Sequence, residues 1–373
     1  MKVLMISKAC YVAAYRRKLE EMARLGIELT LLVPPFWRFG ARRALLEEGN
    51  TAGYRLVVEN PLLNGQHHWH AYRGLGGLLR RLKPDLVHVD EEPYDLVSFH
   101  ATLLARRAGA KVVFFTWQNI DRDYPLLFGL FDRYVMARSA GAICGNQSGT
   151  QILRRKGFVK PLTVIPQFGV DPEVFYPLND WQGSRRAAGT ERPYRIGYVG
   201  RLVPEKGLMS LLQALAELEG NWQLEMLGEG PLRDKLAEAS ASLGIGERVN
   251  LHGGVPSNEV PAFVRGLDTL VLPSLTISNW KEQFGRVIVE AMASAVPVVG
   301  SDSGEIPIVI GDVGLVFPEG DAAALRAHLR RLMTDLPLRL DLSTRSRQRA
   351  MDCFTQASIA EQTCAFYRRV MGG

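Results

Sequence analysis

The chain has 373 residues, of which 47% are apolar and 23% charged, a composition typical of a globular protein with room for two domains. Its four cysteines have no C-x-x-C spacing, which argues against a zinc site or a disulfide framework. No apolar run reaches the ~18 residues of a membrane span, so we expect a cytoplasmic protein, at most peripheral on the inner face of the membrane.

Positive charge is concentrated in the first part of the chain. Residues 1–175 carry 24 Lys and Arg against 16 Asp and Glu, whereas the rest carries 21 against 23. This surplus predicts either a solvated basic face or attraction to an anionic partner, such as a lipid head group or a phosphate-bearing acceptor. Nucleic acid is disfavoured as the partner, because aromatic and basic residues are not interleaved.

Apolar strands alternate with helices in the first half. The predicted strands are apolar on both faces, which is typical of a parallel sheet covered on both sides. They lie at residues 2–7, 27–34, 84–90, 110–117, 139–146 and 162–168. The sequence HHWH at 67–70 could hold a metal, but it lacks the i, i+4 spacing of a helical site, and a solvated loop is the favoured interpretation.

Residues 171–195 interrupt this pattern with prolines, glycine and charge, and predict a linker between domains. The alternation of strands and helices then restarts at residue 194 and continues toward the C-terminus. The prediction is an α/β protein with two open sheets, whose ligands bind at the carboxyl ends of the strands in a cleft between domains.

The segment GYVGRLVPEKG at 197–207 stands between a predicted strand and a predicted helix. Gly200 permits a sharp turn, and Arg201 and Lys206 bring two cations to a helix N-terminus, an arrangement that suits a diphosphate. The alternative is a surface loop with two cations. No P-loop and no G-x-G-x-x-G motif follows a strand, which disfavours a P-loop ATPase and an NAD enzyme.

Glu282 and Glu290 bracket a short apolar stretch. On one continuous helix they would lie roughly 12 Å apart, beyond the ~5–10 Å of glycosidase carboxylate pairs. They could instead hold two parts of a long polar ligand, with the backbone N–H groups of Phe284 and Gly285 at the helix start meeting an anion. The alternative for Glu290 is a buried glutamate paired with a backbone amide or an arginine.

Three segments, at 164–177, 197–207 and 282–307, together resemble the retaining family-4 glycosyltransferases of GT-B fold. The resemblance implies two Rossmann-like domains whose parallel sheets face a central cleft. Residues 1–172 would form the acceptor-binding domain and residues 178–352 the nucleotide-sugar-binding domain. A C-terminal helix at 355–373 would pack back on the first domain.

The resemblance also implies a role for each motif residue. Arg201 and Lys206 would stabilise the leaving diphosphate, Glu282 would contact the donor sugar, and Glu290 would bind the ribose, gaining a partner only when the donor is bound. The remaining residues expected to contact the donor are Gly200, Phe284, Gly285 and Arg286. The implied reaction is retaining transfer of a hexosyl unit from a nucleotide-diphospho-sugar to a polysaccharide, glycolipid or other hydroxyl acceptor, without metal or cofactor.

The first domain departs from the family pattern. Gln118 stands where many members have a histidine near the sugar, so we expect Gln118 or Asn119 to position the donor sugar. The alternative is that both residues are structural. Glu92, in a loop with Glu91 and Asp95, could bind acceptor hydroxyls or be solvated. Two other functions stay open: a sugar-nucleotide epimerase or phosphorylase-like enzyme of the same fold, and a catalytically idle protein that binds sugar nucleotides or polysaccharide.

Overall fold

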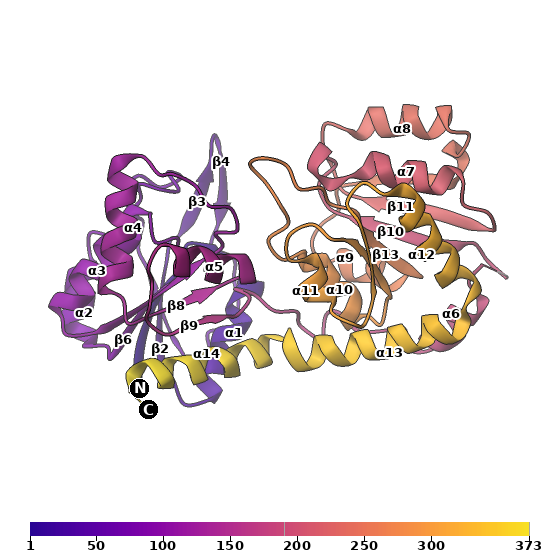
Figure 1. Ribbon diagram of the computed structural model, residues 1–373. Coiled ribbons are helices and arrows are strands. Elements are labelled where there is room, and N and C mark those ends of the chain that lie inside the picture. The colour runs from indigo at the N-terminus through magenta and orange to yellow at the C-terminus, as the bar shows by residue number, and fades with distance from the viewer. Residues whose placement is uncertain (190, 373) are drawn as a thin grey trace. The chain divides into compact units, whose positions relative to one another are not determined.

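The structure is a computed structural model that describes residues 1–189 and 191–372. The chain divides into two compact units, coloured by residue number in Figure 1. Unit 1 comprises Met1–Gly169 and the C-terminal helix α14 (Gln356–Met371), and unit 2 comprises Val170–Thr355.

Unit 1 is built on a seven-stranded parallel sheet with the order β5-β2-β1-β6-β7-β8-β9. This confirms the predicted parallel sheet, and its central strands are buried along nearly their whole length because both faces are covered. The strands of the sheet are β1 (Lys2–Ile6), β2 (Glu28–Val33), β5 (Arg55–Val58), β6 (Leu86–Val89), β7 (Lys111–Thr116), β8 (Gly141–Cys144) and β9 (Leu162–Val164). The helices are α1 (Arg17–Arg24), α2 (Leu75–Leu82), α3 (Leu96–Arg107), α4 (Leu126–Arg138) and α5 (Gln147–Arg155), with short 3-10 helices η1 (Ala9–Tyr11) and η2 (Ala13–Arg16).

Two hydrophobic layers enclose the sheet of unit 1. On one face, α1 and α14 pack side by side and contribute Leu19 and Ile359 to a cluster with strand residues such as Leu31. On the other face, α2 and α3 form a second cluster with the opposite side of the strands. Helix α14 is also tied to the sheet through a buried hydrogen bond of 2.5 Å between Tyr367 and His88.

Several elements of unit 1 have no counterpart among the predicted ones. An antiparallel hairpin joins β3 (Phe36–Phe39) to β4 (Arg42–Leu45), and β5 also lies outside the predicted strands. The hairpin and β5 are short and largely exposed, so their sequences lack the continuous apolar run by which buried strands are recognised.

Unit 2 repeats the design with a six-stranded parallel sheet, in the order β12-β11-β10-β13-β14-β15. Its strands are β10 (Tyr194–Val199), β11 (Trp222–Leu227), β12 (Val249–Gly253), β13 (Thr269–Leu272), β14 (Val298–Ser301) and β15 (Leu315–Phe317). Its helices are α6 (Trp181–Ala187), α7 (Leu208–Ala216), α8 (Arg233–Ser242), α9 (Val260–Arg265), α10 (Arg286–Ala293), α11 (Ile306–Ile310), α12 (Ala322–Thr334) and α13 (Leu336–Cys353), with short 3-10 helices η3 (Pro204–Lys206) and η4 (Gly246–Arg248).

The predicted irregular linker at 171–195 is wrong for part of its length, because α6 lies within it and β10 begins at Tyr194. Asp180 caps α6 by accepting a hydrogen bond from the backbone of Gly183 at 2.9 Å. Arg185 then buries its guanidinium in unit 2. A polar sequence therefore forms a helix here because tertiary contacts hold it.

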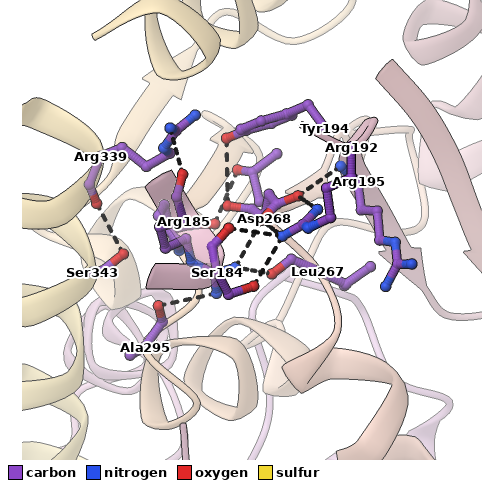
Figure 2. Close-up of polar contacts among 12 residues, drawn as sticks. Ser184, Arg185, Arg192, Tyr194, Arg195, Leu267, Asp268, Ala295, Arg339 and Ser343 are labelled. Atoms are coloured by element: carbon purple, nitrogen blue, oxygen red, sulfur yellow. Dashed lines mark hydrogen bonds and ion pairs between the residues drawn. The ribbon is translucent and has the colours of Figure 1, made fainter. Parts of the chain in front are cut away.

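Figure 2 shows the network that receives Arg185. The fully buried Asp268 carboxylate accepts hydrogen bonds from Arg185 Nη1 at 3.0 Å, from both terminal nitrogens of Arg192 at 2.6 and 2.8 Å, and from the Arg195 backbone N–H at 2.9 Å. Arg339 of α13 donates to the Arg185 carbonyl at 2.6 Å. One carboxylate thus joins α6 to the strands at their amino ends, the edge opposite that of the predicted ligand site.

Candidate functional site

In unit 2 the predicted site residues follow two neighbouring strands, β10 and β13. Gly200 and Arg201 come directly after β10, Glu282 lies in the segment between β13 and α10, and β14 ends beside them in the sheet order. Because parallel strands end at one edge of the sheet, these segments meet at the edge where open α/β sheets bind ligands.

The loop after β10 approaches the loop after β13 closely. Gly207 has φ +65°, and a Cβ at this position would lie 1.9 Å from the Pro273 carbonyl oxygen, so only glycine fits. The Leu275 N–H donates to the Glu205 carbonyl at 2.8 Å across the same contact. The glycine of the motif therefore allows the two loops to come into backbone contact, and this contact places Lys206 against the loop after β13.

Lys206 and Glu282 are ion-paired, with 2.5 Å between Nζ and Oε2. Both side chains are largely buried, at 14% and 11% exposed. Ser274 donates a second hydrogen bond to the same Glu282 oxygen at 3.1 Å, and Lys206 Nζ lies 4.8 Å from the centre of the Trp280 ring. The residue expected to hold the diphosphate and the residue expected to hold the sugar are thus direct partners.

Arg201 differs from Lys206 because its side chain is 68% exposed. Its nearest acidic partner is Glu205, at 3.6 Å between Arg201 Nη2 and the carboxylate. The Tyr198 hydroxyl donates to the Arg201 carbonyl at 2.7 Å and so holds its backbone. The backbone of Arg201 is therefore held in place, while its charged side chain extends into solvent.

Helix α10 begins where the sequence predicts. Gly285 is its N-cap residue, in the left-handed conformation at φ +70°, so Glu282 lies in the preceding loop. Phe284 is buried and packs edge-on against Phe354 at 5.8 Å between ring centres. That the backbone N–H groups of Phe284 and Gly285 meet an anion stays a prediction.

Glu290 lies buried on α10, but the expectation that it gains a partner only with the donor is wrong. Arg286, one helical turn earlier, donates from Nε to Glu290 Oε1 at 2.7 Å. Burial raises the pKa of the Glu290 carboxyl, and the guanidinium partly offsets this. The alternative of a glutamate paired with an arginine is therefore the one that the structure shows. The Arg286 side chain is 48% exposed.

In unit 1 the predicted polar residues also follow the ends of strands. Glu92 comes after β6, and its two oxygens accept from the Thr116 hydroxyl at 2.7 Å and the Trp117 backbone N–H at 2.8 Å, both at the end of β7. Burial raises the pKa of Glu92 to about 7. The solvated-loop alternative is wrong for its neighbours as well, since Glu91 and Asp95 are buried and both face Lys8.

Gln118 and Asn119 are both buried, directly after β7. Lys156 donates to Gln118 Oε1 at 3.2 Å and to Asp132 at 2.8 Å. Since an ammonium only donates, the Gln118 atom that faces Lys156 must be the oxygen, and the amide nitrogen points the other way. That nitrogen has no hydrogen-bond partner within the described chain, so Gln118 keeps one donor available.

The histidine-rich loop is not simply solvated. His70 is fully buried and donates from Nδ1 to the His67 carbonyl at 3.0 Å, and burial lowers its pKa to about 3. His68 instead contacts Asp95. Across residues 1–189 and 191–372, no three His, Cys, Asp or Glu side chains gather as metal ligands.

Sequence reasoning missed Ser274, Trp280 and Lys8. Ser274 and Trp280 belong to the irregular segment between β13 and α10, where no periodic pattern marks individual side chains. Lys8 stands in the segment after β1, in which the sequence shows no motif. Position directly after a parallel strand was the available signal for Ser274 and Lys8.

Comparison with known proteins places this geometry in a class. Two family models match, glycosyl transferases group 1 over residues 182–349 and a glycosyl transferase 4-like domain over residues 12–167. Among solved structures, Anabaena Alr3699/HepE in complex with UDP superposes with a TM-score of 0.73 at 17% identity, covering 99% of this chain and 100% of that one. The fold is GT-B.

Curated relatives identify the family. A 2-deoxystreptamine glucosyltransferase of Streptomyces kanamyceticus is 27% identical over 317 residues, 79% of this chain and 80% of that protein. A GDP-mannose-dependent alpha-(1-6)-phosphatidylinositol monomannoside mannosyltransferase of Mycolicibacterium smegmatis is 31% identical over 267 residues, 67% of this chain and 68% of that protein. The chain belongs to the family-4, group 1 glycosyltransferases and is a glycosyltransferase.

Proposed function

We propose that the protein transfers a hexosyl unit, with retention of anomeric configuration, from a nucleotide-diphospho-sugar to a hydroxyl acceptor, without a metal. The observation that carries the proposal is the pairing of Lys206 with Glu282 at the strand ends of unit 2. The ammonium lies next to the carboxylate that would grip the sugar, so it can reach the bond between sugar and diphosphate.

The chemistry that this site must supply is stabilisation of charge. Breaking the anomeric bond leaves a nucleoside diphosphate with growing negative charge, and positioned cations stabilise charge that develops in the transition state. Lys206 would serve this role from a buried position and Arg201 from solvent. Glu282 would accept hydrogen bonds from sugar hydroxyls and Glu290 from the ribose. The ligand hydroxyls would replace part of the contact that each carboxylate now makes with its cation. Arg286 would then be displaced toward solvent.

In unit 1, Gln118 would donate a hydrogen bond to a sugar hydroxyl through the amide nitrogen that has no partner within the described residues. The nearby Asn119 and the carboxylate Glu92 would complete the polar surface on this unit. The basic surplus of residues 1–175 favours an anionic acceptor or an anionic membrane surface. Within the described chain, no helix combines the length and the apolar character needed to cross a bilayer.

The first experiment measures thermal unfolding with UDP, GDP, ADP and their common sugar conjugates. UDP and GDP come first, because Anabaena HepE forms a complex with UDP and the mannosyltransferase of M. smegmatis is GDP-mannose-dependent. A ligand at 100 times its Kd stabilises by ~2.7 kcal/mol. A shift with one nucleotide, lost in Lys206→Ala, supports the donor site, whereas no shift with any nucleotide contradicts it.

The second experiment follows the donor sugar with and without EDTA and determines the configuration of the product by NMR. Transfer to a hydroxyl with the donor's configuration, unaffected by EDTA, is the expected result. Conversion of the donor sugar without any acceptor would instead indicate an epimerase. Nucleotide binding with no turnover across an acceptor panel would indicate an idle binding protein. Sedimentation with anionic liposomes at low and physiological salt tests the membrane surface, and no binding at either salt contradicts it.

A further inference from the structure

A histidine of the segment between β5 and α2 pairs with the carboxylate that precedes α3, and the donor chemistry does not use this pair. His68 Nδ1 lies 2.7 Å from Asp95 Oδ1. The Asp95 side chain is 2% exposed, whereas the His68 side chain is 52% exposed. A buried carboxylate thus holds an imidazole that reaches solvent.

The hydrogen bond to Asp95 determines the tautomer and the orientation of the His68 ring. Because the carboxylate accepts, Nδ1 carries the proton, and Nε2 is left to face outward. Nε2 makes no hydrogen bond within the part of the chain that the structure describes. It can therefore accept a hydrogen bond from a hydroxyl when the ring is neutral, or donate one when the ring is protonated.

The backbone around His68 is fixed on both sides. The Leu96 N–H donates to the His68 carbonyl at 2.9 Å, and the buried His70 holds the His67 carbonyl at 3.0 Å. On the other side of Asp95, Lys8 Nζ lies 3.7 Å from Oδ2. The imidazole is therefore positioned before any ligand arrives, which lowers the entropic cost of binding.

Aromatic rings surround the exposed imidazole. Tyr94 lies 5.6 Å and Phe128 5.7 Å from the His68 ring, centre to centre. Trp69, 37% exposed, packs on Phe128 at 4.8 Å, and Tyr94 stacks on Tyr124 at 4.4 Å. A polar tip beside partly exposed aromatic rings is the usual composition of a site for a small ligand with an apolar face and a polar rim.

We propose that His68, oriented by Asp95 and flanked by Trp69, Tyr94 and Phe128, binds the ring of a sugar or cyclitol acceptor. The C–H face of the ring would stack on an aromatic side chain while one hydroxyl meets Nε2. This inference rests on the proposed function only in calling the bound ring an acceptor. The binding of a polyol ring at this site can be tested without the donor.

The test titrates the full chain with 2-deoxystreptamine, myo-inositol 1-phosphate and methyl α-D-mannopyranoside, following tryptophan fluorescence. At least one probe should give a saturable change that disappears in Trp69→Phe and needs about tenfold more probe in His68→Ala. The matched control is His252→Ala, since His252 also pairs with a glutamate, Glu225, and is 42% exposed, but lies in unit 2. If His68→Ala fails to fold, Trp69→Ala, at a partly exposed position, is titrated by calorimetry instead, because it lacks the fluorescent reporter, and it should also bind the probe more weakly than wild type.

The probe that binds is then used in a transfer assay. His68→Ala should raise its KM about tenfold and leave the KM of the nucleotide-sugar unchanged, which a merely structural role would not do. No saturable change with any probe, or equal losses in His68→Ala and His252→Ala, would overturn the proposal. If nucleotides shift the melting temperature but no probe binds, only this inference fails. If probes bind but nucleotides do not, only the proposed function fails.

Discussion

Replacing Glu290 with glutamine should separate ligand binding from stability. Burial raises the pKa of this carboxyl above the value of about 4.5 that it has in an unfolded chain. The folded state therefore binds the proton more tightly, and its stability falls as pH rises from about 4.5 toward the folded pKa. At pH 7 the amide in Glu290→Gln removes this cost, while Arg286, half exposed, can be hydrated. We expect the free energy of unfolding to be unchanged or higher.

Nucleotide binding should change in the opposite direction. A hydrogen bond to a charged group contributes ~1.5–3 kcal/mol and a neutral one ~0.5–1.5 kcal/mol, so each ribose hydroxyl loses ~1 kcal/mol when the carboxylate becomes an amide. Two hydroxyls on Glu290 make ~2 kcal/mol, which corresponds to about a 30-fold weaker Kd. The loss is larger than the uncertainty of a calorimetric titration.

The assay is isothermal titration with the nucleotide that stabilises the wild-type protein, alongside urea unfolding of each variant. Glu20→Gln is the matched control: Glu20 is a buried glutamate on α1 of unit 1, and Arg17, on the same helix, donates to it at 2.7 Å. Nucleotide binding by Glu290→Gln as tight as that of the wild type, or an equal loss of affinity in Glu20→Gln, would contradict the assignment of Glu290 to the ribose.

Three further outcomes are expected. Lys206→Met should abolish nucleotide stabilisation and cost ~3–5 kcal/mol in urea unfolding, because it leaves the buried Glu282 without its cation, whereas Glu282→Gln should cost less; equal costs would contradict this. Asp268→Asn should cost a similar ~3–5 kcal/mol yet leave nucleotide affinity unchanged, since the network lies at the amino ends of the strands; weakened binding would count against that placement. The pKa of Glu92, raised to about 7, predicts stability that falls as pH rises from about 4.5 to 7, and Glu92→Gln should flatten this slope in melting curves.

The sequence predicts those parts of the fold whose signal is local. Strand β10 is recognisable as a short, mostly apolar run, and four of its six residues are buried. Helix α10 begins at Gly285 because a glycine in the left-handed conformation starts it. Helix α6 is not recognisable, because what stabilises it is the pairing of Arg185 with Asp268, 83 residues later. A polar segment held by a distant partner carries no local pattern.

The same distinction applies to the candidate site. The motifs identify Lys206, Glu282 and Glu290 as residues of one region, and the structure brings Lys206 and Glu282 within 2.5 Å of each other. Their partners could not be read from the motifs, since a buried charge reveals that it needs compensation but not which residue supplies it. For Glu290 that residue is Arg286, itself a motif residue expected to contact the donor.

These pairings bear on how a donor would bind. An unpaired buried carboxylate costs several kcal/mol, so a site that kept Glu282 and Glu290 bare for the ligand would destabilise unit 2. Each is instead compensated by a cation on a long side chain, Lys206 or the half-exposed Arg286. When a diphosphate draws Lys206 away, the sugar hydroxyls must take over the Glu282 oxygen that it leaves. A nucleotide without its sugar cannot make that exchange, so a nucleotide-sugar should bind more tightly than its nucleoside diphosphate, and Glu282→Gln should remove most of the difference.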